Sequence, residues 1–205
     1  MTYESGTLAP DTVRGMFDRI APVYDVMNRV MTAGLDRRWR KLAVEAERRG
    51  GRVTALDFSP KMLERARRKS GAIEWVEGDA LALPFADGAF DAATVGFGVR
   101  NLADLEGGLR ELARVLRPGG KLAVLEITRP HGILRPFFRL WFDVLIPFAG
   151  RVLPGGQAYT YLPASVRRFP GPDDLSALFE RAGFGDVRYR LLGGGIVALH
   201  VGTKP

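Results

Sequence analysis

The sequence contains no cysteine and only two histidines, His131 and His200, among 205 residues. Without cysteine the chain can form no disulfide, no thiolate nucleophile and no zinc–thiolate site. The two histidines lie far apart with no partner motif, so we expect no metal site. The N-terminal stretch MTYESGTLAPDTVRG has no basic region followed by an apolar run. We therefore expect no secretory signal and a cytoplasmic location.

The sequence also has no uninterrupted apolar run of the about 20 residues that are needed to cross a bilayer. The most apolar stretch, Ile133–Val152, is interrupted by Arg135, Arg139 and Arg151. This pattern is typical of an interfacial helix, or of a lid over an apolar pocket. The alternative is a core helix whose arginines extend outward to solvent.

Acidic residues are outnumbered, with 23 against 30 basic residues and a formal net charge of +7. A basic surface suits nucleic acid, an anionic membrane or an acidic ligand. The sequence has no dense basic run and no aromatic RNA-binding signature. We therefore expect no nucleic-acid partner.

What is present is an alternation of strand and helix patterns, at a length that suits one domain. Residues 1–12 read as a loose tail and residues 13–49 as helices broken at Pro22 and Gly34. Strands are then expected at 52–57, 72–79, 90–97 and 121–127, with helices at 60–69 and 103–116. Repeated strand–helix units predict an α/β fold, a parallel sheet with helices on both faces.

The C-terminal part follows another pattern. Residues 172–184 read as a helix with Asp173 or Asp174 as its N-cap and Gly183 at its C-terminal end. Residues 186–205 read as two strands about a glycine turn, so an antiparallel hairpin should close one sheet edge. Upstream, Pro118 and Gly119 should end a helix before the strand that begins at Lys121.

Acidic residues follow two successive strands, at the positions where parallel sheets bind ligands. Asp57 could accept the hydroxyls of a ribose, or could cap the helix that begins at Ser59-Pro60. Asp79, followed by the small Ala80, could bind the amine of an adenine, or could be a turn residue. The third strand ends in VGFGVRN. There Arg100 and Asn101 could hold a substrate oxygen, with a surface arginine and a helix-capping asparagine as the alternative.

Taken in order, several segments resemble the quinone-biosynthesis C-methyltransferases of the menaquinone and ubiquinone type. MFDRIAPVYDVMNRVMTAGLDRRWR resembles the family's N-terminal signature, with Thr32 in place of serine and Asp36 in place of histidine. The residues that match in this signature are Tyr24, Asp25, Met27, Asn28 and Trp39. RVLRPGGKLAVLEIT resembles the second signature, with Arg117 for lysine and Thr128 for serine. LDFSPKML, GDALALPF, FGVRN and YTYLPASVRRFP resemble further blocks of the family.

The resemblance implies a Rossmann-like methyltransferase sheet, S-adenosylmethionine as cofactor and a polyprenylated quinol as substrate. It implies that Asp57 binds the ribose of the cofactor, that Asp79 and Ala80 bind its adenine, and that Gly96 lies beside it. Arg100, Asn101 and Tyr24 would then be the catalytic residues, with Arg100 stabilising the developing oxyanion. The three parts of the single domain would be a helical cap (1–49), cofactor-binding units (50–128) and a substrate- and membrane-facing part with the hairpin (129–205).

One departure from the family is a missing segment. Between WRKLAVEA and ERRGGRVTALD the family has a strand and a glycine-rich loop that contacts the methionine part of the cofactor; roughly 25–30 residues are absent here. Neighbours of a lost central strand must pair with each other or leave backbone groups unpaired. We therefore expect strand Val53–Leu56 to pair with strand Phe90–Val95.

The leading hypothesis is methylation of a demethylmenaquinol-type quinol in menaquinone biosynthesis. The alternative is a catalytically disabled family member that binds quinone intermediates or partner enzymes, while the two signatures argue against a dehydrogenase. Because the substrate dissolves in lipid, we expect a peripheral location at the inner face of the cell membrane. Whether the chain forms a homo-oligomer stays open.

Overall fold

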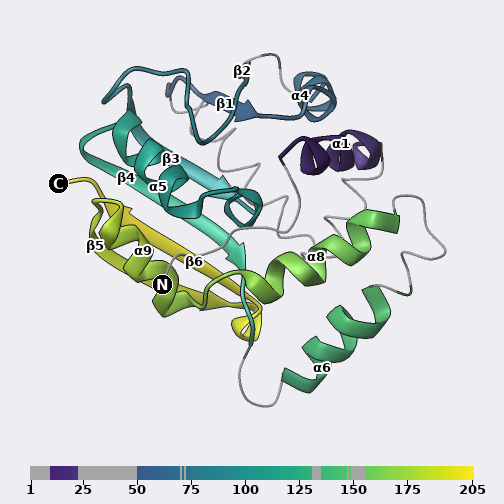
Figure 1. Cartoon of the computed structure of the whole chain (residues 1–205). Helices are drawn as coiled ribbons and strands as arrows, with labels where there is room; N and C mark the ends of the chain where they lie inside the picture. Colours follow the sequence, from purple (N-terminus) through teal and green to yellow (C-terminus); the bar gives the residue numbers. More distant parts are fainter. Residues whose placement is uncertain are drawn as a thin grey trace. The chain divides into compact units, whose positions relative to one another are not determined.

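The structure is a computed structural model whose residues form two compact units, one of residues 11–79 and one of residues 1–10 with 80–205 (Figure 1). The residues that it describes are 10–22, 50–69, 71, 73–130, 135–146, 148 and 156–205. Each unit has a sheet of its own. The single domain expected from the sequence stays a prediction.

The first unit begins with helix α1 (Pro10–Ile20), which buries Val13, Met16 and Ile20 at helical spacing. The prediction of a loose tail over residues 1–12 is therefore wrong from Pro10 onward, because proline fits the first turn of a helix. The predicted break at Pro22 is confirmed by the turn at Ala21-Pro22. Tyr24 and the other matching residues of the N-terminal signature lie outside the described residues.

The strand–helix–strand unit predicted next is confirmed as strand β1 (Thr54–Asp57), helix α4 (Pro60–Arg67) and strand β2 (Glu74–Glu77). Ser59 is the N-cap of α4, and its hydroxyl accepts a hydrogen bond from the Met62 N–H. The two strands are parallel, and Asp57 pairs with Glu77 in the register.

The second unit contains a four-stranded sheet in the order β3-β4-β6-β5 (Figure 1). Its strands are β3 (Phe90–Gly96), β4 (Leu116–Ile127), β5 (Gly185–Leu192) and β6 (Val197–Thr203). Strands β3 and β4 are parallel, whereas β6 is antiparallel to both β4 and β5. The turn η4 (Gly193–Gly195) joins β5 to β6. The antiparallel hairpin at the sheet edge is therefore confirmed.

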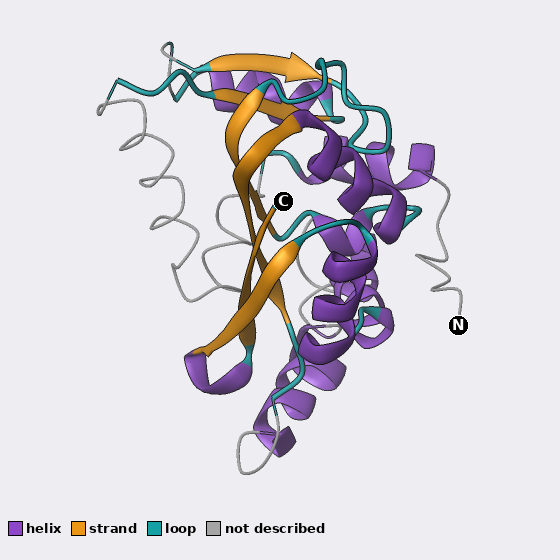
Figure 2. Ribbon diagram, turned by 90° about the vertical axis from the view of Figure 1, so that its left-hand side faces the viewer, coloured by secondary structure: helices purple, strands orange, loops and turns teal. Residues whose placement is uncertain are grey.

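Helices α5 (Leu105–Val115) and α9 (Pro172–Arg181) pack against one face of this sheet (Figure 2). The apolar stripe of α5 buries Leu105, Leu109 and Leu112, and Leu116 continues it as the first residue of β4. Three further helical segments follow β4. They are α6 (Arg135–Leu140), the π-helical turn η3 (Trp141–Leu145) and α8 (Gly156–Arg168).

Two boundary predictions are wrong for local reasons. Arg117–Gly120 do not separate the helix from the strand but form the bulged start of β4, where Gly119 has a φ of 78°. The N-cap of α9 is Gly171, because Pro172 takes the first helical position and places both aspartates inside the first turn. Gly183, with a φ of 96°, ends this helix as predicted.

The predicted pairing of Val53–Leu56 with Phe90–Val95 is also wrong. Among the described residues, β1 pairs with β2 alone and β3 pairs with β4 alone, in separate sheets. Strand β3 exposes Ala92, Thr94 and Gly96, which alternate along the strand and so share one face. The missing segment has therefore not been replaced by closing the two strands together.

Candidate active site

The carboxyl edge of the two-stranded sheet carries both predicted acidic residues. Asp57 is the last residue of β1, and Asp79 follows β2 two residues after Glu77, the register partner of Asp57. The Gly78 N–H donates to the Asp57 carbonyl at 3.2 Å, which extends the pairing beyond the strands. The structure therefore brings Asp57 and Asp79 to one sheet edge. Asp57 is half-buried and Asp79 is exposed.

The Asp57 carboxylate has a local structural role in addition to any ligand role. Its Oδ1 accepts the Ser59 N–H at 2.9 Å, and the Ser59 hydroxyl donates to Asp18 at 2.7 Å. Burial raises the pKa of Asp57, hydrogen bonds from the Ser59 and Phe58 backbone oppose this rise, and the Asp18 charge adds to it. Ser59, and not Asp57, is the N-cap of the helix. Asp57 instead accepts a hydrogen bond in the turn just before the cap.

In the second unit, the predicted residues lie at the end of β3. Gly96 ends the strand and is exposed, and Phe97 adopts a left-handed backbone with a φ of 58°. The chain then makes the 3₁₀ turn η1 (Val99–Asn101). Ala80, also in this unit, is half-buried in the turn that follows β2.

Arg100 is buried and ion-paired. Its Nη1 donates to Glu126 Oε1 at 2.6 Å and to the Phe97 carbonyl at 2.7 Å. The side chains of Arg100 and Glu126 are only 6% and 1% exposed. Arg100 is therefore not the surface arginine of the alternative interpretation, and its Nε is buried without a hydrogen-bond partner in the described part of the chain.

Asn101 joins η1 to helix α8. Its Nδ2 donates to the Phe97 carbonyl at 3.3 Å, and its Oδ1 accepts the Tyr161 hydroxyl at 3.1 Å. Burial raises the pKa of Tyr161, although the positive charges of Arg100 and Arg168 act in the opposite direction. The Nε and Nη2 groups of Arg168 are also buried without partners. The positive charges of two guanidinium groups that have unused donors thus oppose the rise in the pKa of Tyr161, the tyrosine that donates to Asn101.

Glu126, Tyr161 and Arg168 were not predicted as functional residues. Glu126 lies in the second family signature, and Tyr161 and Arg168 lie in the block YTYLPASVRRFP, so a signal was present for all three. The sequence alone does not show that these blocks meet the VGFGVRN segment. Only the pairing of β4 with β3 and the contact of α8 with η1 bring them together.

His200 has a structural environment. It is buried, its Nε2 lies 2.9 Å from the Pro172 carbonyl, and its ring stacks on Tyr189. Burial lowers its pKa. The described part of the chain contains no group of three metal-binding side chains, and His131 lies outside it. No helix within the described ranges is long and apolar enough to cross a membrane.

Sequence comparison places this arrangement among known proteins. The profile of the ubiE/COQ5 methyltransferase family matches residues 42–204. A demethylmenaquinone methyltransferase from Thermus thermophilus is 45% identical over 221 residues, covering 93% of this chain and all of the relative. One from Deinococcus radiodurans is 42% identical over 94% of this chain and 92% of the relative.

The Thermus comparison also shows by how much this chain is shorter than the relative. The 93% of this chain that aligns is about 191 residues, whereas the alignment runs over 221 positions. About 30 of those positions therefore have no counterpart in this chain. This agrees with the missing strand and loop inferred from the family pattern.

Solved structures confirm the α/β methyltransferase fold. An S-adenosylmethionine-dependent methyltransferase from Thermotoga maritima, described as a possible histamine N-methyltransferase, has a TM-score of 0.64 at 20% identity and covers 93% of this chain and 99% of that one. The cyclase SpnF has a TM-score of 0.65 at 14% identity and covers 100% of this chain and 99% of that one. Because these two proteins differ in activity, the likeness shows the fold alone.

Proposed function

Since this chain belongs to the ubiE/COQ5 methyltransferase family, we propose that it transfers a methyl group from S-adenosylmethionine to a ring carbon of a polyprenylated quinol. The conversion of demethylmenaquinol to menaquinol is the reaction that its relatives' names support best. The enzyme is a class I methyltransferase by family and fold. None of the relatives described above favours the alternative of a disabled, purely binding protein.

The residues at the strand ends fit the adenosine part of S-adenosylmethionine. Asp57 is half-buried with a raised pKa, so hydrogen bonds from ribose hydroxyls would offset part of the cost of burying its charge. Asp79 is exposed and Ala80 is small, which suits an adenine amine and its ring. Exposed Gly96 leaves room for close approach of a ligand. When bound, the cofactor supplies an electrophilic methyl group.

The single observation that carries the substrate proposal is the set of unused buried donors around Tyr161. Arg100 Nε and the Nε and Nη2 of Arg168 have no acceptor among the residues that the structure describes. A buried donor without an acceptor costs about 1–3 kcal/mol, so the site gains when a ligand oxygen arrives. A quinol whose hydroxyl loses its proton provides such an oxygen, and its negative charge suits two guanidinium groups.

The neighbouring side chains position this oxygen rather than remove its proton. Tyr161 has a raised pKa and therefore remains a protonated phenol at neutral pH, which donates its hydrogen bond to Asn101. Asn101 keeps one further N–H for a substrate, because an amide has two and the Phe97 carbonyl takes one. Glu126 is held by Arg100 and is unsuited to act as a base. The proposal retains Tyr24 as a positioning residue by its match to the family signature.

Transfer of a labelled methyl group from S-adenosylmethionine to a demethylmenaquinol in detergent or lipid tests the function. The expected product is the methylated quinol, with turnover reduced in Arg168→Gln and little changed in the control Arg188→Gln. Arg188 is an exposed arginine on β5, so this control removes the same charge elsewhere. Cofactor binding without any methylated product would contradict the proposal.

The missing segment calls for a second arm of the same assay. A family-type strand and glycine-rich loop inserted after Ala46 would restore the contacts to the methionine end of the cofactor. We expect the insertion to tighten cofactor binding and to raise turnover, because this sequence has no such loop between WRKLAVEA and ERRGGRVTALD. Equal affinity and turnover in both proteins would mean that another part of the chain already fulfils that role.

The peripheral membrane location is supported by an apolar surface formed by residues of α6 and η3 together with Phe148, which follows them; we call it the outer face. Its members recur at helical spacing and are strongly exposed: Phe137 (68%), Leu140 (53%), Val144 (53%) and Phe148 (61%). The opposite side of the segment is not exposed, since Phe142 and Ile146 are buried. The side with Phe142 and Ile146 therefore packs as a core helix does, whereas the outer face is suited to interfacial binding.

Vesicle flotation tests the outer face. Phe138 is a poor site for a disrupting charge, because it is half-buried and stacks on Phe142 with ring centroids 4.2 Å apart. Phe137→Asp with Val144→Asp should abolish recovery with vesicles, and Tyr189→Asp with Leu191→Asp is the control on an exposed apolar pair of β5. Equal flotation of both double variants would remove the outer face as the membrane contact.

A further inference from the structure

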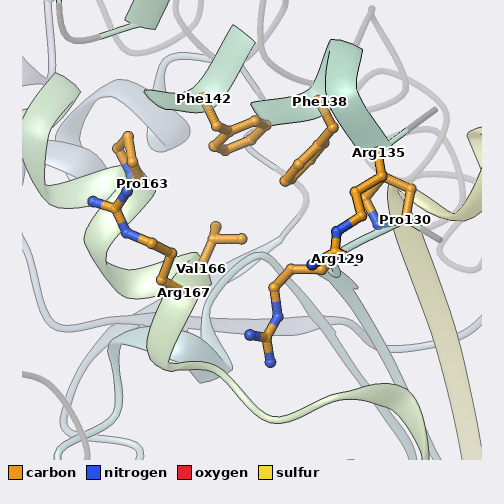
Figure 3. A pocket seen from close by; sticks show the side chains of 8 residues that line it. All are labelled: Arg129, Pro130, Arg135, Phe138, Phe142, Pro163, Val166 and Arg167. Atoms are coloured by element: carbon orange, nitrogen blue, oxygen red, sulfur yellow. The ribbon is translucent and has the colours of Figure 1, made fainter. Parts of the chain in front are cut away.

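A cavity of about 200 Å³ lies between α6, η3, α8 and the residues that follow β4 (Figure 3). Its lining combines apolar side chains with arginines: Arg129, Pro130, Arg135, Phe138, Phe142, Pro163, Val166 and Arg167. The rings of Phe138 and Phe142 point into it, and Arg135 and Arg167 stand on its two sides (Figure 3). Among the described residues that line it, none has an acidic side chain.

The cavity is separate from the candidate active site. Tyr161, Ser165 and Arg168 share one face of α8, since they are spaced by four and three residues. Pro163, Val166 and Arg167 line the cavity from the other side of the same helix. The helix therefore separates the cavity from Asn101, the residue that Tyr161 contacts.

The lining selects a ligand that is partly apolar and partly anionic. An uncharged prenyl chain offers no hydrogen-bond acceptor to the guanidinium groups that line the cavity. A small free anion would leave the two aromatic rings uncovered. A phosphate ester with an attached hydrocarbon satisfies both, because arginines bind phosphate oxygens in pairs and the rings contact the methylene groups.

We propose that this cavity binds the phosphate and the adjoining glycerol of an anionic membrane phospholipid. The volume is below the about 300 Å³ at which pockets enclose a whole drug-sized ligand, so only the head region fits inside. The acyl chains must leave the cavity, and the exposed outer face of the same two segments offers apolar surface for them. The site thus gives the protein a preference for lipid charge in addition to simple apolar adhesion.

Calorimetric titration of the full chain with a short-chain lipid tests the site without a membrane. Dihexanoylphosphatidylglycerol below its micelle concentration should bind, and dihexanoylphosphatidylcholine should bind more weakly because its cation faces the arginines. Arg129→Gln with Arg167→Gln should weaken phosphatidylglycerol binding by about 25-fold, at about fivefold for each arginine. The matched control, Arg188→Gln with Arg190→Gln, removes two exposed charges from β5 and should change binding less than twofold.

Further arms separate the cavity from other sources of binding. Val166→Phe fills the cavity at unchanged charge and should weaken binding, with thermal unfolding as the check on folding. Phe137→Asp with Val144→Asp should retain most binding of the soluble lipid, even where vesicle flotation is lost. Displacement of the lipid by equimolar inorganic phosphate would identify a free-phosphate site and overturn the proposal. Equal loss in the Arg188 and Arg190 control, or no loss in the Arg129 and Arg167 variant, would also overturn it.

Discussion

The two strand ends that carry the proposed ligand-binding residues, one in each unit, satisfy their polar groups in different ways. At the end of β1, Asp57 accepts backbone N–H groups of the next turn and remains half-buried, with Asp79 exposed beside the same edge. At the end of β3, Arg100 is enclosed and neutralised by Glu126, which is almost fully buried. The first end is shaped by local turn contacts, whereas the second depends on a residue 26 positions away.

Because of this difference, we expect substitutions at the end of β1 to change ligand affinity and substitutions of the Arg100–Glu126 pair to change stability. A carboxylate held by its own turn can lose its ligand contact without loss of the fold, so substitutions there should act on affinity. The buried ion pair between η1 and β4 contributes little to stability when intact, but removal of one partner leaves the other charge buried and uncompensated.

The largest effect is expected from Glu126→Gln. The substitution keeps the shape of the side chain but leaves the Arg100 guanidinium buried without a compensating charge, which costs about 3–5 kcal/mol. Urea unfolding measures the loss. Glu64→Gln is the control, because Glu64 pairs with Arg68 at the surface and should matter by less than about 1 kcal/mol. Similar values for both variants would mean that the buried pair contributes no more than a surface pair.

Asp57→Ala should act on cofactor affinity. Ribose hydroxyls left without their acceptor cost about 1–3 kcal/mol, which corresponds to roughly five- to 150-fold in Kd. Isothermal titration with S-adenosylmethionine measures it. Asp87→Ala removes an exposed carboxylate that pairs with Arg114 and should leave Kd unchanged. An unaltered Kd in Asp57→Ala would remove Asp57 from the cofactor site.

Tyr161→Phe should have a smaller effect, on catalysis more than on folding. It removes one hydrogen bond to Asn101 worth about 1 kcal/mol, so kcat/KM for methyl transfer should fall roughly fivefold. Tyr189→Phe is the matched control, since its hydroxyl donates to Asp173 at 2.8 Å on an exposed part of β5. If both variants lose activity equally, the Tyr161–Asn101 bond has no specific part in the reaction.

The smallest effect concerns pH. The folded protein holds the Asp57 proton more tightly than the unfolded chain, because burial raises the pKa above its ordinary value of 3.8. This contribution to stability is complete below 3.8 and is lost as pH rises through the raised value. Asp57→Asn cannot ionise, so at neutral pH it should be slightly more stable than the parent. Unfolding free energies of both proteins from acid to neutral pH measure this, and parallel curves would contradict it.

Local patterns were sufficient for much of the fold. Helix α4 could be predicted because Ser59 and Pro60 form a cap and a first turn without help from distant residues. The hairpin of β5 and β6 was predictable because three consecutive glycines accept the positive φ that its turn requires. The strands before both site loops were predictable from their apolar runs, with errors of one to a few residues at their ends.

Long-range contacts limited the prediction of the site. Arg100 could be identified from its segment, but its burial depends on Glu126, whose side chain reaches it only after β4 pairs with β3. Tyr161 meets Asn101 across 60 positions of sequence. The pairing of β1 failed for a similar reason, because which strands become neighbours depends on the whole sheet rather than on their own residues.

The left-handed backbone of Phe97 has a consequence for how the loop after β3 opens. A non-glycine residue in this region holds about 1–3 kcal/mol of strain, which persists only while its surroundings fix it. Here the Phe97 N–H donates to Leu125, and its carbonyl accepts both Arg100 and Asn101. Breaking any one of these bonds releases strain and weakens the remaining ones. The loop should therefore open as a cooperative unit, and the amide hydrogens of Phe97 and Asn101 should exchange with solvent at closely similar rates.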